Sequence, residues 1–357
     1  MKTNKQSIGI DISKETFTAC MCVMDPKGQL NFSDVKHFKN EKAGFNQFLR
    51  WVRKIKSKEV SINFLMEATG IYYEKLAHHL YDIKQDVIVV LPNTSKHYFL
   101  SLNVKTKTDE IDAKILSQFA IERTHKKWIK PSETYLHLRN LTRYYVQLHE
   151  QKTSLGNIKH SKDNSFDVQN LILNSNKKLI KAIDKQILLV KTEIEKLIKS
   201  DQELNKKVEK LLTIKGVGII TVATVIAETL GFQHVKNIKQ LVSYAGYDVV
   251  QRESGTSIKG KTRISKKGNR YIRNALYFPA MVACRYNENL KQNYLRIIQK
   301  KPSKMIGQVA IQRKLLTLIY ALWKKDEVYI EEYTKNKIAP PINSEAIQDR
   351  EPEVILP

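Results

Sequence analysis

The first 127 residues combine a group of neighbouring strands with a later alternation of helices and strands. Apolar or alternating runs over 7–11, 16–24 and 29–38, separated by short turns, predict three antiparallel strands. Apolar residues at helical spacing over 45–55 precede a strand over 60–66, a helix over 71–81, a strand over 87–91 and a helix that opens at Asp109. This order matches an RNase H-like fold, so we expect an α/β domain over residues 1–127.

Four acidic residues stand at the ends of these elements. Asp11 closes the first strand, Glu67 closes the fourth, and Asp109 and Asp112 lie in the first turn of the last helix. Residues three apart on a helix share a face. Because central strands end together and a helix can lay its first turn beside them, we expect the four carboxylates to converge on one or two Mg²⁺ ions. Each acid alone also fits a solvated strand end or a helix N-terminus.

The charge of the chain identifies a class of partner. Lys and Arg number 61 against 36 Asp and Glu in 357 residues, for a formal net charge of +25 and a pI of about 9.7. Nucleic acid is the expected partner, with an affinity that falls steeply with salt. Cys20, Cys22 and Cys284 show no disulfide or zinc-site spacing and fit a reducing cytoplasm. We find no signal peptide and no apolar run long enough for a membrane span.

Residues 128–210 have a helical pattern with a heptad-like repeat. The first apolar series, broken at Lys152, is Leu138, Leu141, Tyr145, Leu148 and Leu155. The second, with Asp201 in its one gap, is Ile180, Ile183, Ile187, Val190, Ile194, Leu197, Leu204, Val208 and Leu211. Such spacing is typical of a coiled coil, and we expect a segment that joins copies of the chain into a dimer or tetramer. A two-helix hairpin packed within one chain explains the pattern nearly as well.

A Gly-Val-Gly triplet then interrupts a helical apolar pattern. It comprises Gly216, Val217 and Gly218 and follows Lys215. The pattern is typical of a helix-hairpin-helix, in which backbone N–H groups approach a phosphate at a helix N-terminus. A plain turn between helices fits the same residues.

Residues 251–273 form a basic, glycine-containing loop. Against a single acid it holds eight basic residues: Arg252, Lys259, Lys261, Arg263, Lys266, Lys267, Arg270 and Arg273. This composition predicts a loop that binds phosphates. The loop also contains Ser254 before Gly255, where serine is commonly a turn residue. A serine hydroxyl attacks phosphorus only with help from a base or a metal.

Together these motifs resemble those of the IS110/IS1111-type transposases. Segments 9–14, 66–70 and 107–113 resemble the DEDD motif of that family, and segments 245–246, 254–255 and 263–269 resemble its C-terminal transposase domain. Tyr247 and Val249 depart from the family pattern at positions that are not proposed ligands.

The resemblance implies a function. It implies a RuvC-like domain with Asp11, Glu67, Asp109 and Asp112 as catalytic metal ligands and Ser254 as a nucleophile that links to DNA. The implied partners are duplex DNA at donor and target sites and a structured non-coding guide RNA. The protein would then work in a prokaryotic cytoplasm, at the nucleoid.

We expect four segments along the chain. They are a RuvC-like catalytic domain over 1–127, an α-helical coiled-coil segment over 128–210, a mainly α-helical transposase domain with the helix-hairpin-helix over 211–333, and a disordered tail over 334–357. Two other functions stay open. One is a RuvC-like Mg²⁺-dependent DNA endonuclease that acts without the serine, and the other is a nucleic-acid-binding protein without enzymatic activity.

Overall fold

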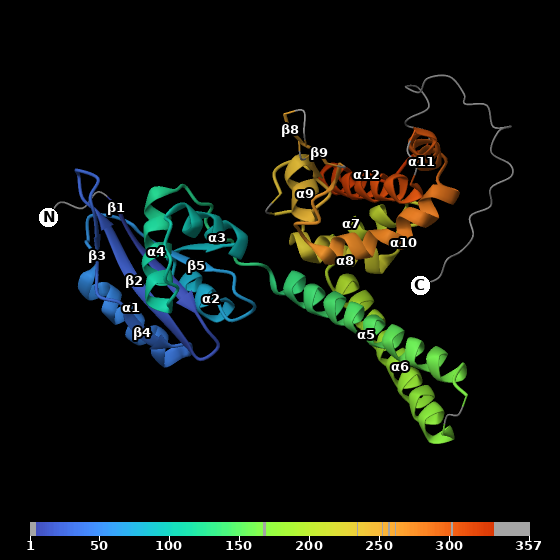
Figure 1. Ribbon diagram of the computed structural model, residues 1–357, viewed down its shortest axis with the longest axis horizontal. Coiled ribbons are helices and arrows are strands. Elements are labelled where there is room, and N and C mark those ends of the chain that lie inside the picture. Colours follow the sequence, from blue (N-terminus) through green and yellow to red (C-terminus); the bar gives the residue numbers. More distant parts are fainter. Residues whose placement is uncertain are drawn as a thin grey trace. The chain divides into compact units, whose positions relative to one another are not determined.

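The computed structural model describes residues 5–166, 169–233, 235–251, 253–255, 258–260, 262–300 and 303–331 (Figure 1). The chain divides into two compact units, Met1–Lys130 and Pro131–Pro357. In the described ranges, no helix is both long enough and apolar enough to cross a membrane. The predicted tail over 334–357 lies outside the described residues.

The N-terminal unit is built on a mixed sheet. Its strands are β1 (Lys5–Ile12), β2 (Thr16–Met24), β3 (Leu30–Phe32), β4 (Lys36–Lys39), β5 (Ile62–Glu67) and β6 (Asp86–Val90). The strand order is β3-β2-β1-β5-β6, with β4 also paired to β2. The first strands pair antiparallel, whereas β5 runs parallel to both β1 and β6. The predicted α/β architecture is confirmed, in the order expected of an RNase H-like sheet.

The single strand predicted over 29–38 is wrong, because the chain leaves the sheet between β3 and β4. Phe32 pairs with Cys22 and Lys36 pairs with Ala19, so three residues (33–35) face two residues of β2. The Ser33 hydroxyl accepts a hydrogen bond from Met21 N at 3.0 Å and replaces a ladder partner at this bulge.

Four helices cover the two faces of this sheet. They are α1 (Lys42–Ile55), α2 (Glu74–Asp82), α3 (Pro92–Ser101) and α4 (Asp109–Glu122). Ile8, Ile10 and Ile12 of β1 join the core with α1 and α2. Because side chains alternate along a strand, Ser7, Gly9 and Asp11 face the opposite side, where α4 packs. The helix predicted over 71–81 begins at Glu74, and α3 was not predicted.

Gly9 allows α4 to lie directly on β1. A Cβ atom at Gly9 would stand 2.1 Å from the backbone N of Ser117 and 2.2 Å from the carbonyl O of Ala113. The Ser7 hydroxyl donates to the Ser117 carbonyl at 2.6 Å. These contacts fix the height of α4 along the strand, and with it the position of the first turn of the helix.

The C-terminal unit is mainly helical, as predicted. Its helices are α5 (Glu133–Asp163), α6 (Asn170–Ser200), α7 (Gln202–Leu212), α8 (Ile219–Thr229), α9 (Ile238–Ala245), α10 (Arg270–Tyr286), α11 (Glu288–Lys300) and α12 (Lys304–Lys325). Two short hairpins between α9 and α10 pair β7 (Val249–Val250) with β10 (Arg263–Ile264) and β8 (Glu253–Ser254) with β9 (Ile258–Lys259). The sequence did not predict α11.

Helices α5 and α6 lie along each other within the chain and project from the rest of this unit (Figure 1). The apolar series of the sequence contributes to this packing, with Val190 and Ile194 buried and Leu197 partly buried. The expectation that Asp201 fills a position within the second apolar series of the coiled coil is wrong. Its carboxylate accepts a hydrogen bond from Leu204 N at 3.0 Å and caps α7, so the series spans two helices. A coiled coil between copies of the chain stays a prediction.

The Gly-Val-Gly triplet connects α7 to α8. Gly216 has φ of +91°, and a Cβ there would lie 3.1 Å from the Pro279 carbonyl and from the Val282 side chain. Gly218 is the N-cap residue of α8 and has open space around its Cα. Packing against α10 therefore explains Gly216, while the phosphate contact of a helix-hairpin-helix stays a prediction.

Candidate active site

Strand register brings Asp11 and Glu67 together. Strands β1 and β5 are parallel neighbours, and the last pair in their register is Ile10 and Met66. Asp11 and Glu67 follow these two residues, so they stand side by side at the carboxyl ends of adjacent strands. Alternation puts both side chains on the sheet face that α4 covers. The sequence placed these two acids correctly at strand ends.

Helix α4 adds Asp109 and Asp112 from its first turn. Thr108 caps the helix, and its side chain accepts a hydrogen bond from Ile111 N at 3.3 Å. Along β1, Ser7 faces Ser117 and Gly9 faces Ala113, so α4 runs in the opposite direction to the strand. The continuation of this pairing places the first turn of α4 beside Asp11.

The electrostatics of Asp11 show that the four acids are near one another. Partial burial raises the pKa of Asp11 to about 6, and the negative charges of Asp112, Asp109 and Glu67 add to the increase. The positive charge of Lys107 opposes it. The pKa of Asp112 is also raised, first by burial, with Glu67 and Asp109 contributing and Lys107 again opposing. The cluster is therefore short of positive charge.

Three side chains around the acids complete the site. The Ser95 hydroxyl donates to Glu67 Oε2 at 2.5 Å, and the Thr69 hydroxyl donates to Oε1 at 3.3 Å. Lys107 Nζ lies 3.9 Å from Asp112 Oδ2. The sequence analysis missed Ser95, although Pro92 at the first position of α3 is a helix-start signal that could have located its helix.

The donor set fits a hard divalent cation. All four candidate ligands are carboxylates, and their mutual repulsion is what a bound cation would relieve. Across the described residues, no three His, Cys, Asp or Glu side chains are already gathered so as to hold a metal ion. The ligand assignment therefore stays a prediction.

The predicted nucleophile and its basic loop belong to the C-terminal unit. The backbone of Ser254 lies in β8 and that of Lys259 in β9. Arg252 and Lys261 lie outside the described residues. The exposed basic residues of the described loop are Arg263, Lys266, Lys267 and Arg270.

Two other predicted phosphate-binding residues are engaged within the chain. Lys215 Nζ forms an ion pair with Glu331 at 2.7 Å. Arg273 Nη1 donates to the Ala245 carbonyl at 2.7 Å, at the C-terminus of α9. Both residues thus contribute to the fold of this unit as the structure stands.

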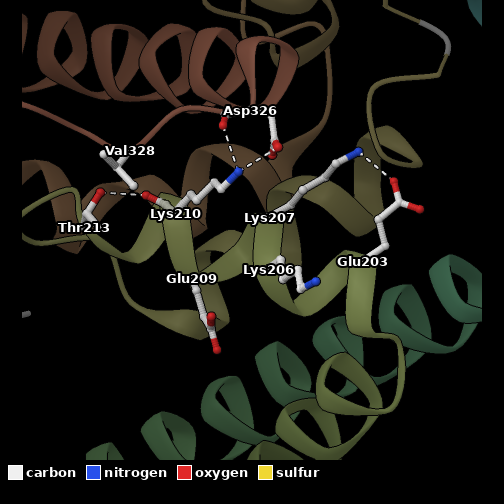
Figure 2. Close-up of a pocket in the computed structure, with 8 residues that line it drawn as sticks. All are labelled: Glu203, Lys206, Lys207, Glu209, Lys210, Thr213, Asp326 and Val328. Carbon is white, nitrogen blue, oxygen red and sulfur yellow. Dashed lines mark hydrogen bonds and ion pairs between the residues drawn. The ribbon is translucent and has the colours of Figure 1, made fainter.

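Figure 2 shows a pocket of the C-terminal unit that holds none of the predicted site residues. Lys210 donates to Asp326 Oδ2 at 2.6 Å, and Lys207 lies 3.1 Å from Glu203. Two of the three lysines that line the pocket are thus paired with acids of their own chain.

Known proteins resemble this chain in both units. A family model of DEDD-type IS110 transposases matches residues 8–161, and that of the transposase IS116/IS110/IS902 family matches residues 208–295. The pilin gene-inverting proteins of Moraxella bovis and Moraxella lacunata are 28% and 29% identical, and each comparison covers 91% of this chain and 98% of the relative. The structure of Thermus thermophilus RuvC covers 34% of this chain and 99% of its own, with 12% identity and a TM-score of 0.27.

Proposed function

The chain belongs to the IS110 family of transposases, and we propose that it recombines DNA with a carboxylate-held divalent metal and a covalent serine intermediate. The observation that supports the proposal is that strand register and the Gly9 contact put Asp11, Glu67 and the first turn of α4, with Asp109 and Asp112, at the same end of the sheet.

The four carboxylates would hold one or two Mg²⁺ ions, which supply positive charge to the oxygens of a reacting phosphodiester. Ser254 would attack the phosphorus. One Oγ–P bond forms as one P–O bond of the DNA strand breaks, and the released DNA hydroxyl takes up a proton. The number of phosphate ester bonds is conserved, so a second DNA hydroxyl can reverse the step without an external energy source.

A covalent adduct tests this chemistry. Reactions on labelled DNA are stopped with denaturant, and protein-linked DNA is separated on a denaturing gel. We expect an adduct with the wild-type protein and with Ser257→Ala, and none with Ser254→Ala or Asp11→Asn. Cutting that continues in Ser254→Ala without any adduct would identify a metal-dependent endonuclease instead. An adduct that persists in Ser254→Ala but disappears in Ser257→Ala would move the nucleophile to Ser257.

We also propose that a structured RNA guides the protein to duplex DNA. The net charge of +25 and the exposed Arg263, Lys266 and Lys267 support the binding of two polyanions. The measurement is recombination by purified protein before and after ribonuclease treatment. Equal recombination after removal of all RNA would contradict a guide.

Self-association through the α5–α6 pair is the third part of the proposal. Helix α6 exposes Leu179, Leu188 and Leu189, whose relative exposures are 51%, 65% and 60%. Exposed leucines on a projecting helix pair favour contact with a second copy. We expect Leu188→Glu with Leu189→Glu to reduce the oligomer to a monomer in light scattering, and Gln202→Glu, an exposed change on α7, to leave it unchanged. A persistent oligomer in the leucine variant would contradict this interface.

A further inference from the structure

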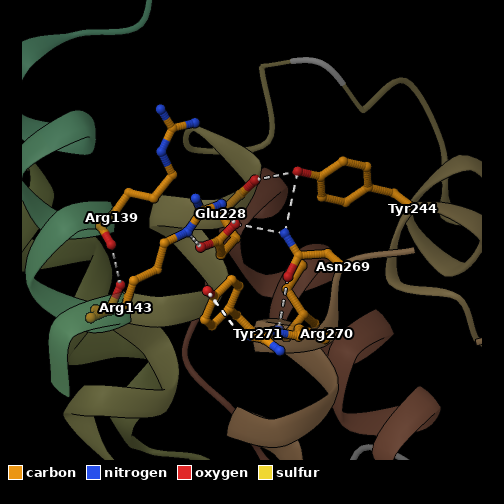
Figure 3. Close-up of polar contacts among 9 residues, drawn as sticks. Arg139, Arg143, Glu228, Tyr244, Asn269, Arg270 and Tyr271 are labelled. Atoms are coloured by element: carbon orange, nitrogen blue, oxygen red, sulfur yellow. Dashed lines mark hydrogen bonds and ion pairs between the residues drawn. The ribbon is translucent and has the colours of Figure 1, made fainter. Parts of the chain in front are cut away.

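Glu228 on α8 carries a carboxylate that is almost completely removed from water. Its relative exposure is 3%, and Figure 3 shows the polar side chains around it. Burial of a carboxylate is strongly unfavourable unless charge and hydrogen bonds compensate it. The side chains that compensate Glu228 come from distant parts of the C-terminal unit.

Arg143 of α5 and Asn269 before α10 saturate this carboxylate. Arg143 donates from Nε to Oε1 at 2.6 Å and from Nη2 to Oε2 at 2.8 Å, which is a bidentate pair. Asn269 Nδ2 donates to Oε2 at 2.6 Å. The Arg143 guanidinium also lies 4.8 Å from the centre of the Tyr271 ring, which fixes its plane.

Asn269 and Tyr244 are the two stems of the loop that contains Ser254. The Asn269 N–H donates to the Tyr244 carbonyl at 2.7 Å, and the Tyr244 hydroxyl donates to the Glu228 carbonyl at 2.8 Å (Figure 3). Between them, Lys266 N donates to the Gly246 carbonyl at 3.1 Å. We call these contacts of residues 244–246 and 266–269 the loop neck. Gly268 makes the closure possible, since a Cβ there would lie 2.5 Å from the Tyr244 carbonyl.

We propose that Glu228 is a positioning residue that fixes the loop neck to α5, and so holds the Ser254 loop in place for strand exchange; the inference rests on the proposed function. Helix α5 begins at Glu133, directly after the N-terminal unit ends at Lys130. Arg143 therefore connects the loop neck to the first helix of the C-terminal unit. Glu228 itself is buried and makes no contact with DNA in this role.

A purely structural role predicts a different outcome from a positioning role. Buried ion pairs are commonly replaced by apolar side chains without loss of stability. The double variant Arg143→Met with Glu228→Leu should therefore stay folded while it releases Asn269 and the loop neck. Glu228→Gln is the conservative variant, because it keeps the shape and removes the charge that holds Arg143.

Hydrogen exchange and adduct formation are measured together on the full-length protein. In both variants we expect the amides of Lys266 and Asn269 to exchange at least tenfold faster than in wild type, with the amides of α12 unchanged. Adduct formation at Ser254 should slow at least tenfold, while DNA affinity stays within twofold. Glu209→Gln, a surface glutamate of the same unit with a hydrogen bond from Asn205, is the matched control and should change none of these.

The outcomes separate this inference from the proposed function. Unchanged hydrogen exchange of the loop neck in the variants would overturn the inference. Variants that exchange faster but form the adduct at the wild-type rate would overturn it as well. If the wild-type protein forms no adduct but the variants exchange faster, the proposed function fails, and Glu228 is retained as the residue that holds the loop neck. Restoration of both stability and adduct rate by the apolar double variant would reduce Glu228 to a structural residue.

Discussion

In the N-terminal unit, the partly buried Asp11 and the buried Asp112 lie among other acids, whereas in the C-terminal unit the carboxylate of Glu228 receives N–H groups on both oxygens. Lys107 is the cation that opposes the first group, at 3.9 Å from Asp112. Arg143 neutralises Glu228, and both Arg143 and Asn269 donate hydrogen bonds to it at 2.6–2.8 Å. The N-terminal carboxylates still lack positive charge, whereas the charge and hydrogen bonds of its own chain already satisfy Glu228. The first can take a ligand, while the second can only hold its own chain together.

The largest expected effect is on the saturated carboxylate. Arg143→Met leaves Glu228 buried without its charge partner, and such a loss costs about 3–5 kcal/mol. We expect the free energy of unfolding of the C-terminal unit to fall by that amount. The measurement is urea denaturation followed by Trp323, which lies in the core of this unit, with the tryptophans of the other unit replaced by phenylalanine.

An exposed ion pair on the same helix is the control for Arg143→Met. Lys152 of α5 lies 2.7 Å from Asp184 of α6, and both side chains are about half exposed. Lys152→Met should change the unfolding free energy by about 0–1 kcal/mol. Equal losses in the two variants would mean that burial does not distinguish these pairs.

The second prediction concerns the unsaturated cluster. A divalent cation that binds the folded N-terminal unit stabilises it by about 2.7 kcal/mol at a concentration of 100 times Kd. We expect Mg²⁺ or Mn²⁺ to raise the melting temperature of this unit and to leave the C-terminal unit unchanged. The shift should vanish in Asp112→Asn and stay in Glu110→Gln, a neighbouring exposed acid that pairs with His37. A cation effect that Asp112→Asn leaves intact would place the ion elsewhere.

The sequence predicts much of the carboxylate cluster in the N-terminal unit and little of the contacts around Glu228 in the C-terminal unit. Asp11 and Glu67 are visible because strand ends are local patterns, and Asp109 and Asp112 because they are three apart on one helix. The partners of Glu228 are 85 and 41 residues away in the chain, and no local period relates them. The bulge at Ser33 was missed for a similar reason, since it depends on which residues of β2 lie opposite.

The third prediction uses the pH dependence of the cluster. The folded pKa of Asp11 is about 6, above its ordinary value of 3.8, so the folded state binds more protons than the unfolded state between these values. Stability of the N-terminal unit should therefore fall as pH rises from about 4 to about 6 and stay flat above. We expect a loss of roughly 1–2 kcal/mol, less than the full effect of the pKa because Asp11 is partly exposed. Asp11→Asn should reduce this dependence and leave the part that comes from Asp112, whose pKa burial also raises; an unchanged pH profile in the variant would assign all of it to other groups.

The smallest expected effect concerns a feature that the carboxylate cluster shares with Glu228, which is a hydrogen bond from a neutral side chain to a carboxylate. Ser95 is fully buried and donates to Glu67 at 2.5 Å, as Asn269 donates to Glu228. Glu67 is partly exposed and water can replace the lost donor, so Ser95→Ala should destabilise the N-terminal unit by about 1 kcal/mol.

The same substitution should also weaken binding of the cation, because Glu67 loses the contact that fixes its orientation. We expect a several-fold rise in the concentration of Mg²⁺ needed for half of the melting-temperature shift. Ser101→Ala is the control, since Ser101 lies on the same helix and its hydroxyl donates only to the helix carbonyl of Tyr98. If Ser95→Ala and Ser101→Ala bind the cation equally well, strand register alone sets the position of Glu67. Glu67 would then not depend on its buried hydroxyl donor, in contrast to Glu228, whose carboxylate holds the Asn269 amide.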